Sequence, residues 1–162
     1  MYFTLAIVLS SGAAGESDSL YSLYTKDFGK IRARAQGVKK VDAKLRGHLE
    51  TLALSRVGFV QTRHGERLVY AEALEGFGAI RSDIERMKTA LYVAALLDEA
   101  IFPGEPDLPV WGLLERTLAE IEKSIPPFDP ILSRFESEFL EHLGYGGADN
   151  ISILGLPVPR PV

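Results

Sequence analysis

The hydrophobic positions in the first half of the chain follow the pattern of short strands. Runs of β-branched and large apolar residues are bounded by Gly, Ser and Asp, and Gly12 and Gly15 mark the first turn. Residues 38–48 interrupt this pattern, because they have poor strand character and suit a short helix. The pattern predicts five strands, at residues 3–9, 19–25, 29–36, 49–60 and 67–77.

Five short strands with a helical piece between the third and the fourth are typical of a small Greek-key barrel of the OB type. An SH3-like barrel fits the same composition. OB barrels present an exposed sheet face and loops to oligonucleotides, so this fold class makes nucleic acid a natural ligand to consider.

In the second half, the apolar residues recur at intervals of three and four. The first such stretch predicts an amphipathic helix over residues 82–101, with Ser82 and Glu85 spaced as a capping box at its start. The segment Phe102-Pro103-Gly104 ends this helix.

Two further helices are expected downstream. Asp107 is a suitable N-cap for the second, and Asp129 is a suitable N-cap for the third, since Pro130 then takes the first helical position. Gly144 stands where the residue after a helix end belongs. The stripe that contains Trp111 is interpreted as core.

Charge divides the chain into two parts. Residues 1–80 hold eleven basic and eight acidic side chains, whereas residues 81–162 hold seven basic and fourteen acidic ones. Two domains with different roles are the simplest cause. We therefore expect an α+β protein with an OB-fold nucleic-acid-binding domain at 1–79, a small helical domain at 80–145 and a loosely ordered tail at 146–162.

Composition excludes several classes of site. The 162 residues include no cysteine and only three histidines, so disulfides and thiolate metal sites are ruled out and a zinc site is not expected. The longest apolar run, residues 91–97, is far below the roughly 20 residues of a membrane span. No Lys or Arg precedes the apolar run at 3–9, which is interpreted as a strand and not as a secretory signal. A cytoplasmic location follows, and no cofactor is predicted.

The most informative segment is the third strand, where basic and small or apolar residues alternate. Successive side chains of a strand point to opposite faces, so the basic ones form a row spaced about 6.6 Å apart while the others face the core. The row consists of Lys30, Arg32 and Arg34.

More cations follow this row, and residues 26–46 hold eight basic side chains against two acidic ones. Such a cluster favours nucleic acid, because phosphate contacts supply much of the affinity for DNA. The alternative is the solvated face of an edge strand, where lysines prevent aggregation. Phe28, in the turn before the row, is a candidate for stacking on bases. The candidate DNA-binding residues are Phe28, Lys30, Arg32, Arg34, Lys39, Lys40, Lys44 and Arg46.

No catalytic residues are predicted. Glu138, Glu141 and His142 lie together on the third helix, but without a second histidine at metal spacing they are interpreted as a solvated face. No nucleophile has an evident base nearby in the sequence, which disfavours an enzyme.

The order and spacing of several short segments resemble the RecO family of bacterial recombination mediators. Segments of the second half, including 103–106, are similar to that family's helical domain. The segments of the first half are Ala6-Ile-Val-Leu9, Gly15-Glu-Ser-Asp18, Leu23-Tyr-Thr25, Phe28-Gly-Lys-Ile-Arg32, Ala35-Gln-Gly-Val-Lys-Lys40 and Leu45-Arg-Gly47, and those of the second half include Leu91-Tyr-Val-Ala-Ala-Leu-Leu97 and Phe139-Leu-Glu-His-Leu-Gly-Tyr145.

This resemblance implies an OB domain followed by a helical domain, in agreement with the pattern. It also implies binding of single- and double-stranded DNA, annealing of complementary strands, and cooperation with RecR, RecA and single-strand-binding protein, without catalysis. Family members commonly carry a zinc-binding cysteine cluster after the segment that matches Leu143-Gly-Tyr145, and this chain has no cysteine. It therefore resembles a short form. The alternative function is a protein-interaction module of the recombination machinery with little DNA binding of its own.

Overall fold

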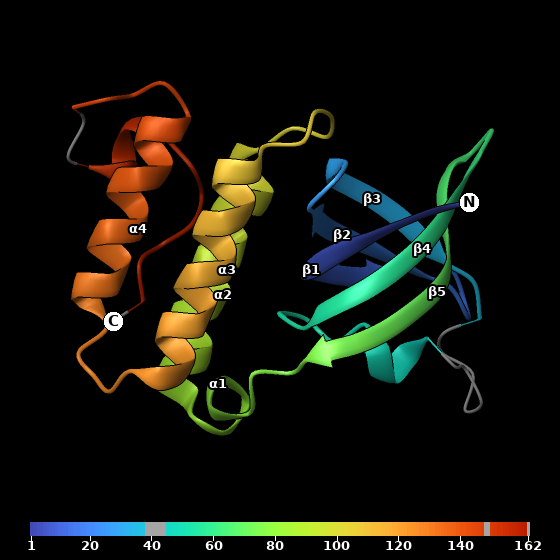
Figure 1. Ribbon diagram of the computed structural model, residues 1–162, viewed down its shortest axis with the longest axis horizontal. Coiled ribbons are helices and arrows are strands. Elements are labelled where there is room, and N and C mark those ends of the chain that lie inside the picture. Colours follow the sequence, from blue (N-terminus) through green and yellow to red (C-terminus); the bar gives the residue numbers. More distant parts are fainter. Residues whose placement is uncertain (38–44, 148–149, 162) are drawn as a thin grey trace. The chain divides into compact units, whose positions relative to one another are not determined.

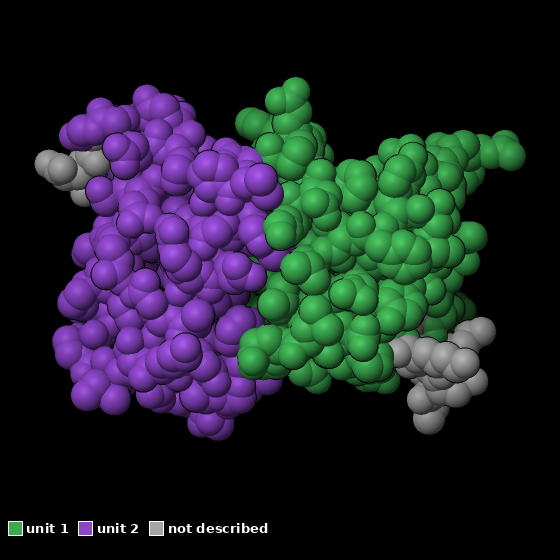
Figure 2. All heavy atoms as spheres, in the orientation of Figure 1, with its two compact units in different colours: residues 1–76, 101–106 green, residues 77–100, 107–162 purple. Residues whose placement is uncertain are grey.

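The computed structural model describes residues 1–37, 45–147 and 150–161. They divide into two compact units, coloured green and purple in Figure 2. The first unit combines Met1–Gly76 with the short segment Ile101–Pro106, and the second combines Phe77–Ala100 with Asp107–Val162. A single boundary near residue 79, as expected from the sequence, would assign Ile101–Pro106 to the helical domain, whereas this segment belongs to the first unit.

The first unit is a closed barrel of five strands, in the order β1-β2-β3-β5-β4 (Figure 1). Neighbouring strands are antiparallel except β3 and β5, whose parallel contact closes the barrel. This arrangement confirms the predicted OB fold, and the SH3-like alternative is set aside. The elements are β1 (Tyr2–Ala13), β2 (Ser19–Thr25), β3 (Gly29–Ala35), the 3-10 helix η1 (Arg46–His48), β4 (Leu54–Thr62) and β5 (Gly65–Glu75).

The strand bounds differ most from the expected ones at β1 and β4, and β5 runs over Gly65–Glu75 where 67–77 was expected. β1 continues to Ala13, because its ladder with β2 runs on to the pair of Ala13 and Ser19, so Gly12 lies in a strand and not in a turn. β4 begins only at Leu54. Leu52, just before it, is fully buried and has a φ of 73°, a left-handed value outside the extended region that strands occupy.

The second unit contains four helices among its described residues, where three were predicted. They are α1 (Gly78–Ser82), α2 (Ile84–Ala100), α3 (Leu108–Lys123) and α4 (Asp129–His142), followed by a 3-10 helix η2 (Ile151–Leu154). The additional helix arises because the backbone is extended at Asp83, which separates α1 from α2.

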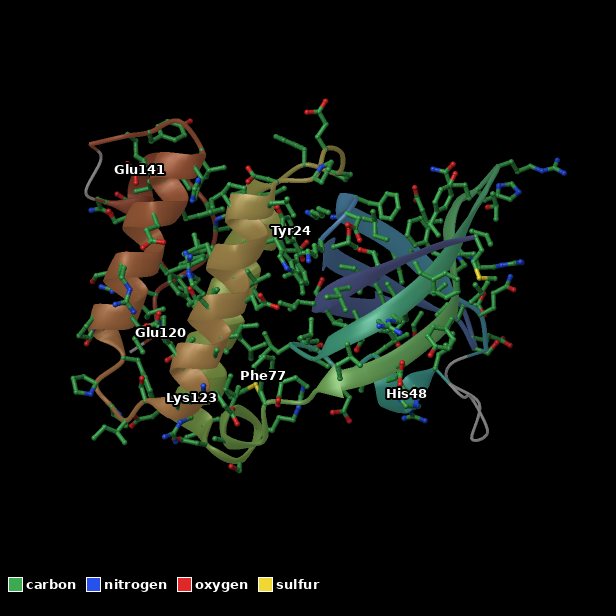
Figure 3. All side chains as sticks on the ribbon, in the orientation of Figure 1. Tyr24, His48, Phe77, Glu120, Lys123 and Glu141 are labelled. Atoms are coloured by element: carbon green, nitrogen blue, oxygen red, sulfur yellow. The ribbon has the colours of Figure 1, made fainter. Side chains whose placement is uncertain are left out.

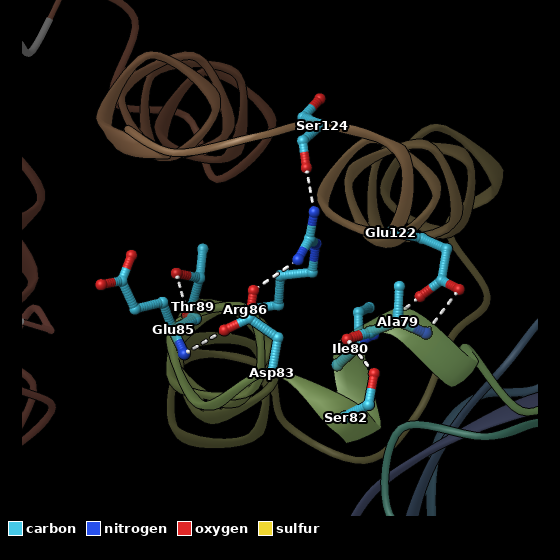
Figure 4. Close-up of polar contacts among 9 residues, drawn as sticks. All are labelled: Ala79, Ile80, Ser82, Asp83, Glu85, Arg86, Thr89, Glu122 and Ser124. Carbon is cyan, nitrogen blue, oxygen red and sulfur yellow. Dashed lines mark hydrogen bonds and ion pairs between the residues drawn. The ribbon is translucent and has the colours of Figure 1, made fainter.

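The capping box predicted from Ser82 and Glu85 is wrong (Figure 4). Ser82 is the last residue of α1, and its Oγ donates a hydrogen bond to the carbonyl of Ala79. Asp83 takes the capping role instead, since its Oδ1 accepts a hydrogen bond of 3.1 Å from the backbone N–H of Glu85. Because Ser and Asp are both preferred N-cap residues, the sequence alone does not decide which of Ser82 and Asp83 caps the helix.

The start of α1 is capped by a side chain of another helix. The carboxylate of Glu122 on α3 accepts hydrogen bonds of 2.9 Å from the backbone N–H groups of both Ala79 and Ile80 (Figure 4). These N–H groups have no partner inside the helix, and a negative charge at a helix N-terminus is favourable. Glu122 therefore ties α1 to α3.

The two downstream caps have different outcomes. Asp107 caps α3 as expected, because its Oδ1 accepts from the backbone N–H of Val110 at 3.1 Å. The prediction for Asp129 is wrong, since α4 begins at Asp129 itself and Phe128 precedes it. Gly144 follows the end of α4 with a φ of +91°, as its predicted place requires.

The segment after Gly146, expected to be loosely ordered, includes η2 and then returns to α4. Arg160 lies 3.4 Å from the carboxylate of Glu136 and donates a 3.1 Å hydrogen bond to the hydroxyl of Ser133. The same carboxylate oxygen, Oε1 of Glu136, accepts a 2.7 Å hydrogen bond from the hydroxyl of Tyr92 on α2. The half-exposed arginine thus contributes the positive charge beside a carboxylate that is only 9% exposed.

Candidate nucleic-acid interface

The alternation predicted for the third strand holds along most of β3. Ile31, Ala33 and Ala35 are buried in the barrel core, whereas Arg32 and Arg34 are exposed on the outside. Because a strand rises about 3.3 Å per residue, the Cα atoms of these two arginines lie about 6.6 Å apart, and both side chains project from the same face.

Lys30 departs from the expected row, because its side chain is only 3% exposed. Its Nζ donates a hydrogen bond of 3.0 Å to the carbonyl oxygen of Ile101. The contact partner lies 71 residues further along the chain, in the segment Ile101–Pro106. Lys30 therefore holds this segment and is not part of an exposed basic row.

The same segment lies against Gly29, the first residue of β3. Gly29 has a φ of +67°, and a Cβ placed there would lie 2.5 Å from the carbonyl oxygen of Glu105 and 2.8 Å from that of Gly104. Only glycine satisfies both the left-handed backbone and the close approach. The start of β3 therefore packs directly against the backbone of Gly104 and Glu105.

Phe28 is half-buried in an aromatic cluster. Its ring meets those of Tyr2 and Phe59 edge to face, with centroid distances of 5.5 and 5.3 Å. One side still lines a groove of about 360 Å³, together with Arg32, Gln61 and Pro103 among others. Phe28 thus packs mainly against the barrel core, and only part of its ring is accessible to a ligand.

The remaining predicted cations lie in or beside the connection from β3 to β4. Arg46 is exposed on η1. Burial raises the pKa of Tyr21 above its ordinary value, and the nearby positive charge of Arg46 partly offsets this rise. His48, also on η1 (Figure 3), accepts a 3.1 Å hydrogen bond at Nδ1 from the backbone N–H of Ala73 on β5. This bond fixes η1 beside the barrel. Lys39, Lys40 and Lys44 fall outside the described residues.

Two cations that the sequence analysis did not select lie next to the predicted row. The parallel contact of β3 and β5 pairs Arg34 with Arg67, and the turn between β4 and β5 adds Arg63. Arg34 and Arg67 line a groove of about 380 Å³ with residues of that turn, including His64. The sequence marks this turn as polar, but only the strand order brings it beside β3.

A second groove, of about 240 Å³, lies on the other side of the row. It is lined by Arg32 and by residues of β1 and β2, most of which are small or carry a hydroxyl group and leave room for a ligand beside the guanidinium group. These residues are Ser10, Ser11, Gly12, Ala13, Leu20 and Ser22.

We call Arg32, Arg34, Arg63 and Arg67 the barrel arginines. Arg34 lies 3.7 Å from a carboxylate oxygen of Asp18 while remaining 54% exposed. Within the described part of the chain, no salt bridge involves Arg32, Arg63 or Arg67. The charges of these three arginines are therefore not neutralised by carboxylates of the described residues, and they can contact an anion without first breaking an ion pair among those residues.

Sequence comparison identifies the family. Residues 1–77 match the family described as "Recombination protein O N terminal", and residues 81–147 match "Recombination protein O C terminal". The chain belongs to the RecO family. The two matched regions leave only residues 78–80, at the start of α1, and the residues after 147 uncovered.

Several curated relatives carry the name DNA repair protein RecO. The protein from Myxococcus xanthus is 37% identical over 160 residues, which covers 96% of this chain and 65% of the relative. Those from Desulforamulus reducens and Desulforudis audaxviator are 31% and 33% identical, and this chain covers 59% and 57% of their lengths. The chain therefore spans about three fifths of the length of these three relatives.

One of the acidic residues considered for catalysis in this RecO-family chain has a structural partner. Glu138 on α4 accepts a 3.2 Å hydrogen bond from Arg116 on α3. In the part of the chain that the structure describes, no group of three or more His, Cys, Asp or Glu side chains is placed to hold a metal ion. None of the described helices is both long and apolar enough to cross a lipid bilayer.

Proposed function

We propose that this chain binds single- and double-stranded DNA through the outer surface of its barrel. In this role it acts as a recombination mediator in DNA repair, promoting strand annealing or recombinase loading together with partner proteins. The family membership supports this role, and the basic surface of the barrel supplies a physical basis for it. The protein binds and positions strands and does no chemistry on them.

The barrel arginines carry the proposal. Arg34 and Arg67 are neighbours on two strands, and Arg63 extends the positive surface into the turn between β4 and β5. OB barrels use strands β2 and β3, the turn between β4 and β5 and the connection between β1 and β2 to contact oligonucleotides. The two grooves beside Arg32 and Arg34 lie at these places.

Such a surface contacts phosphates and not base edges, so it accepts both single strands and duplexes with little sequence preference. The partners proposed with DNA are RecR, RecA and single-strand-binding protein, in the cytoplasm. These partners follow from the family resemblance alone, and the helical unit is the proposed support or dock for them.

The test is fluorescence anisotropy of labelled single-stranded and duplex oligonucleotides, titrated with the protein at several salt concentrations. We expect the logarithm of the affinity to fall steeply with the logarithm of the salt concentration. In a variant with Arg32→Gln, Arg34→Gln and Arg67→Gln, the slope for single strands should become shallower by about 2, since each lost phosphate contact removes about 0.7.

Lys30 is left unchanged in this variant, because its buried ammonium group holds the segment Ile101–Pro106. Circular dichroism should show an unaltered fold. Absence of binding by the wild type at low salt would contradict the proposal and favour the alternative, a protein-interaction module without DNA binding of its own. An unchanged salt slope in the variant would move the DNA site away from the barrel arginines.

A further inference from the structure

The outer face of β1, β4 and β5 carries an exposed pair of aromatic rings. Phe3 on β1 is 54% exposed and Tyr70 on β5 is 39% exposed. Their ring centroids lie 5.7 Å apart, with an angle of 70° between the planes. The strand register pairs Phe3 with Gly58 and Gly58 with Tyr70, so the three residues form one row across three strands. We call this row the aromatic platform.

Gly58 makes the platform possible. A Cβ at this position would lie 2.7 Å from Cε1 of Phe3 and 3.1 Å from Cβ of Tyr70. The missing side chain lets the ring of Phe3 lie over β4 and meet Tyr70. Glycine weakens the interior of a strand, and it often marks a place where another group approaches closely.

Tyr70 is held in place by its own strand. Its hydroxyl donates a 3.1 Å hydrogen bond to Oε2 of Glu72, two residues further along β5. The register places Arg56 of β4 between Leu5 and Glu72, in the row next to the platform. A cation therefore stands beside the two rings on the same face.

A groove of about 250 Å³ adjoins Phe3 and includes both Arg56 and Lys26, which are exposed. Asp27 also lines it, but its carboxylate accepts a 2.7 Å hydrogen bond from the hydroxyl of Thr4. Neither Lys26 nor Arg56 forms a salt bridge with another described residue. Two cations thus remain available next to an exposed ring.

We propose that the aromatic platform stacks unpaired bases of single-stranded DNA, whose backbone phosphates contact Arg56 and Lys26. Exposed rings together with adjacent cations are the combination by which proteins hold single strands without sequence preference. In a duplex, both faces of each base are covered by its neighbours, so the platform adds affinity only for single strands. The inference rests on the proposed DNA binding and assigns it a second, strand-selective contact.

The test compares three labelled probes of equal length by anisotropy: a thymidine strand, an abasic strand with the same phosphates, and a hairpin duplex. In the variant with Phe3→Leu and Tyr70→Leu, we expect binding of the thymidine strand to weaken by about fivefold or more per ring. Binding of the abasic strand and of the duplex should stay within about twofold. Leu74→Ala, which truncates another exposed apolar residue of β5, is the matched control.

Two further variants keep the test independent of any effect on folding. Gly58→Ala should weaken thymidine binding selectively by displacing the ring of Phe3, whereas Tyr70→Trp should retain it. Thermal unfolding is measured for each variant. If the double variant loses affinity equally for all three probes, or loses none for the thymidine strand, the platform is overturned. Neither result would contradict the separate proposal that the barrel arginines bind DNA. Lack of wild-type binding to every probe would overturn the proposed function and the platform together. Unchanged DNA binding combined with lost binding to purified RecR would assign the platform to a protein partner.

Discussion

Arginine side chains are used differently in the two units. In the helical unit, cations are paired with carboxylates: Arg86 with Asp83, Arg116 with Glu138, Arg134 with Glu120 and Arg160 with Glu136. Among the described arginines of the barrel, only Arg34 lies within salt-bridge distance of a carboxylate, at 3.7 Å. Four arginines of the helical unit are therefore paired with that unit's own carboxylates, whereas Arg32, Arg63 and Arg67 of the barrel are exposed without a salt bridge to a described residue.

This difference shows why net charge alone is a weak guide to a binding site. A paired arginine on a surface contributes little to stability and is also less available to a ligand. An arginine without a partner keeps its full field and its donors. The number of unpaired cations on one face, and not the charge of the chain, is the quantity to compare between the units.

The largest effect is expected from charge reversal, which tests whether DNA binding depends on the unpaired barrel arginines or on net charge. A variant with Arg32→Glu and Arg67→Glu should bind single-stranded DNA about a hundredfold more weakly or worse, since two phosphate contacts become repulsive. A variant with Arg116→Glu and Arg134→Glu changes the net charge by the same amount in the helical unit and should bind within about threefold of wild type. Anisotropy at one fixed salt concentration measures both, and equal losses would attribute binding to net charge.

The second prediction separates Lys30 from Arg32, its neighbour on the same face of β3. Lys30→Met leaves the carbonyl of Ile101 without this donor and should lower the free energy of unfolding by about 2 kcal/mol. Arg32→Met should change it by less than about 0.5 kcal/mol, because an exposed residue without an ion pair is replaced. Urea denaturation measures both, and a salt slope that changes only in Arg32→Met would complete the contrast.

The third prediction concerns the carboxylate that caps α1. Glu122→Ala removes two hydrogen bonds to backbone N–H groups and should cost about 1 to 2 kcal/mol of unfolding free energy. Glu115→Ala, at an exposed position of the same helix, is the control and should be nearly neutral. DNA affinity should be unchanged in both, and a loss of affinity in Glu122→Ala would argue against a purely structural role.

The smallest effect is expected for Tyr92, whose hydroxyl donates to Glu136. Tyr92→Phe should cost about 1 kcal/mol at neutral pH. Burial, followed by the hydrogen bond to Glu136, raises the pKa of Tyr92 above its ordinary value of 10.0. The unfolded chain then ionises this hydroxyl first, so wild-type stability should fall as the pH rises above about 10, and the fall should be smaller in Tyr92→Phe. Thermal unfolding at several pH values decides this.

The local pattern was sufficient for most of the fold. β2 occupies the predicted residues 19–25, because strand-forming side chains are bounded there by clear turn residues. Asp107 caps α3 as expected for the same reason, since a cap acts within one turn. The cap of α1 could not be predicted in this way, because Glu122 reaches it from a helix about 40 residues away.

The candidate site was predictable only in part. Alternation placed Arg32 and Arg34 on the outside of β3, but it also placed Lys30 there, since its partner carbonyl lies 71 residues away in the sequence. Arg67 was missed because its place beside Arg34 depends on the parallel pairing of β3 and β5. Phe3 was missed because it opens an apolar run at 3–9 that was interpreted only as a strand, with no exposed face assigned to it.

The contact between Gly29, Lys30 and the segment Ile101–Pro106 has a consequence for synthesis on the ribosome. The first 76 residues contain all five strands, yet the backbone that packs on Gly29 and accepts from Lys30 is translated only after α2. During this interval the ammonium group of Lys30 lacks the Ile101 carbonyl. A nascent barrel is therefore complete in its strands before it is complete in its hydrogen bonds, and a fragment cut at residue 76 would stay in that intermediate condition.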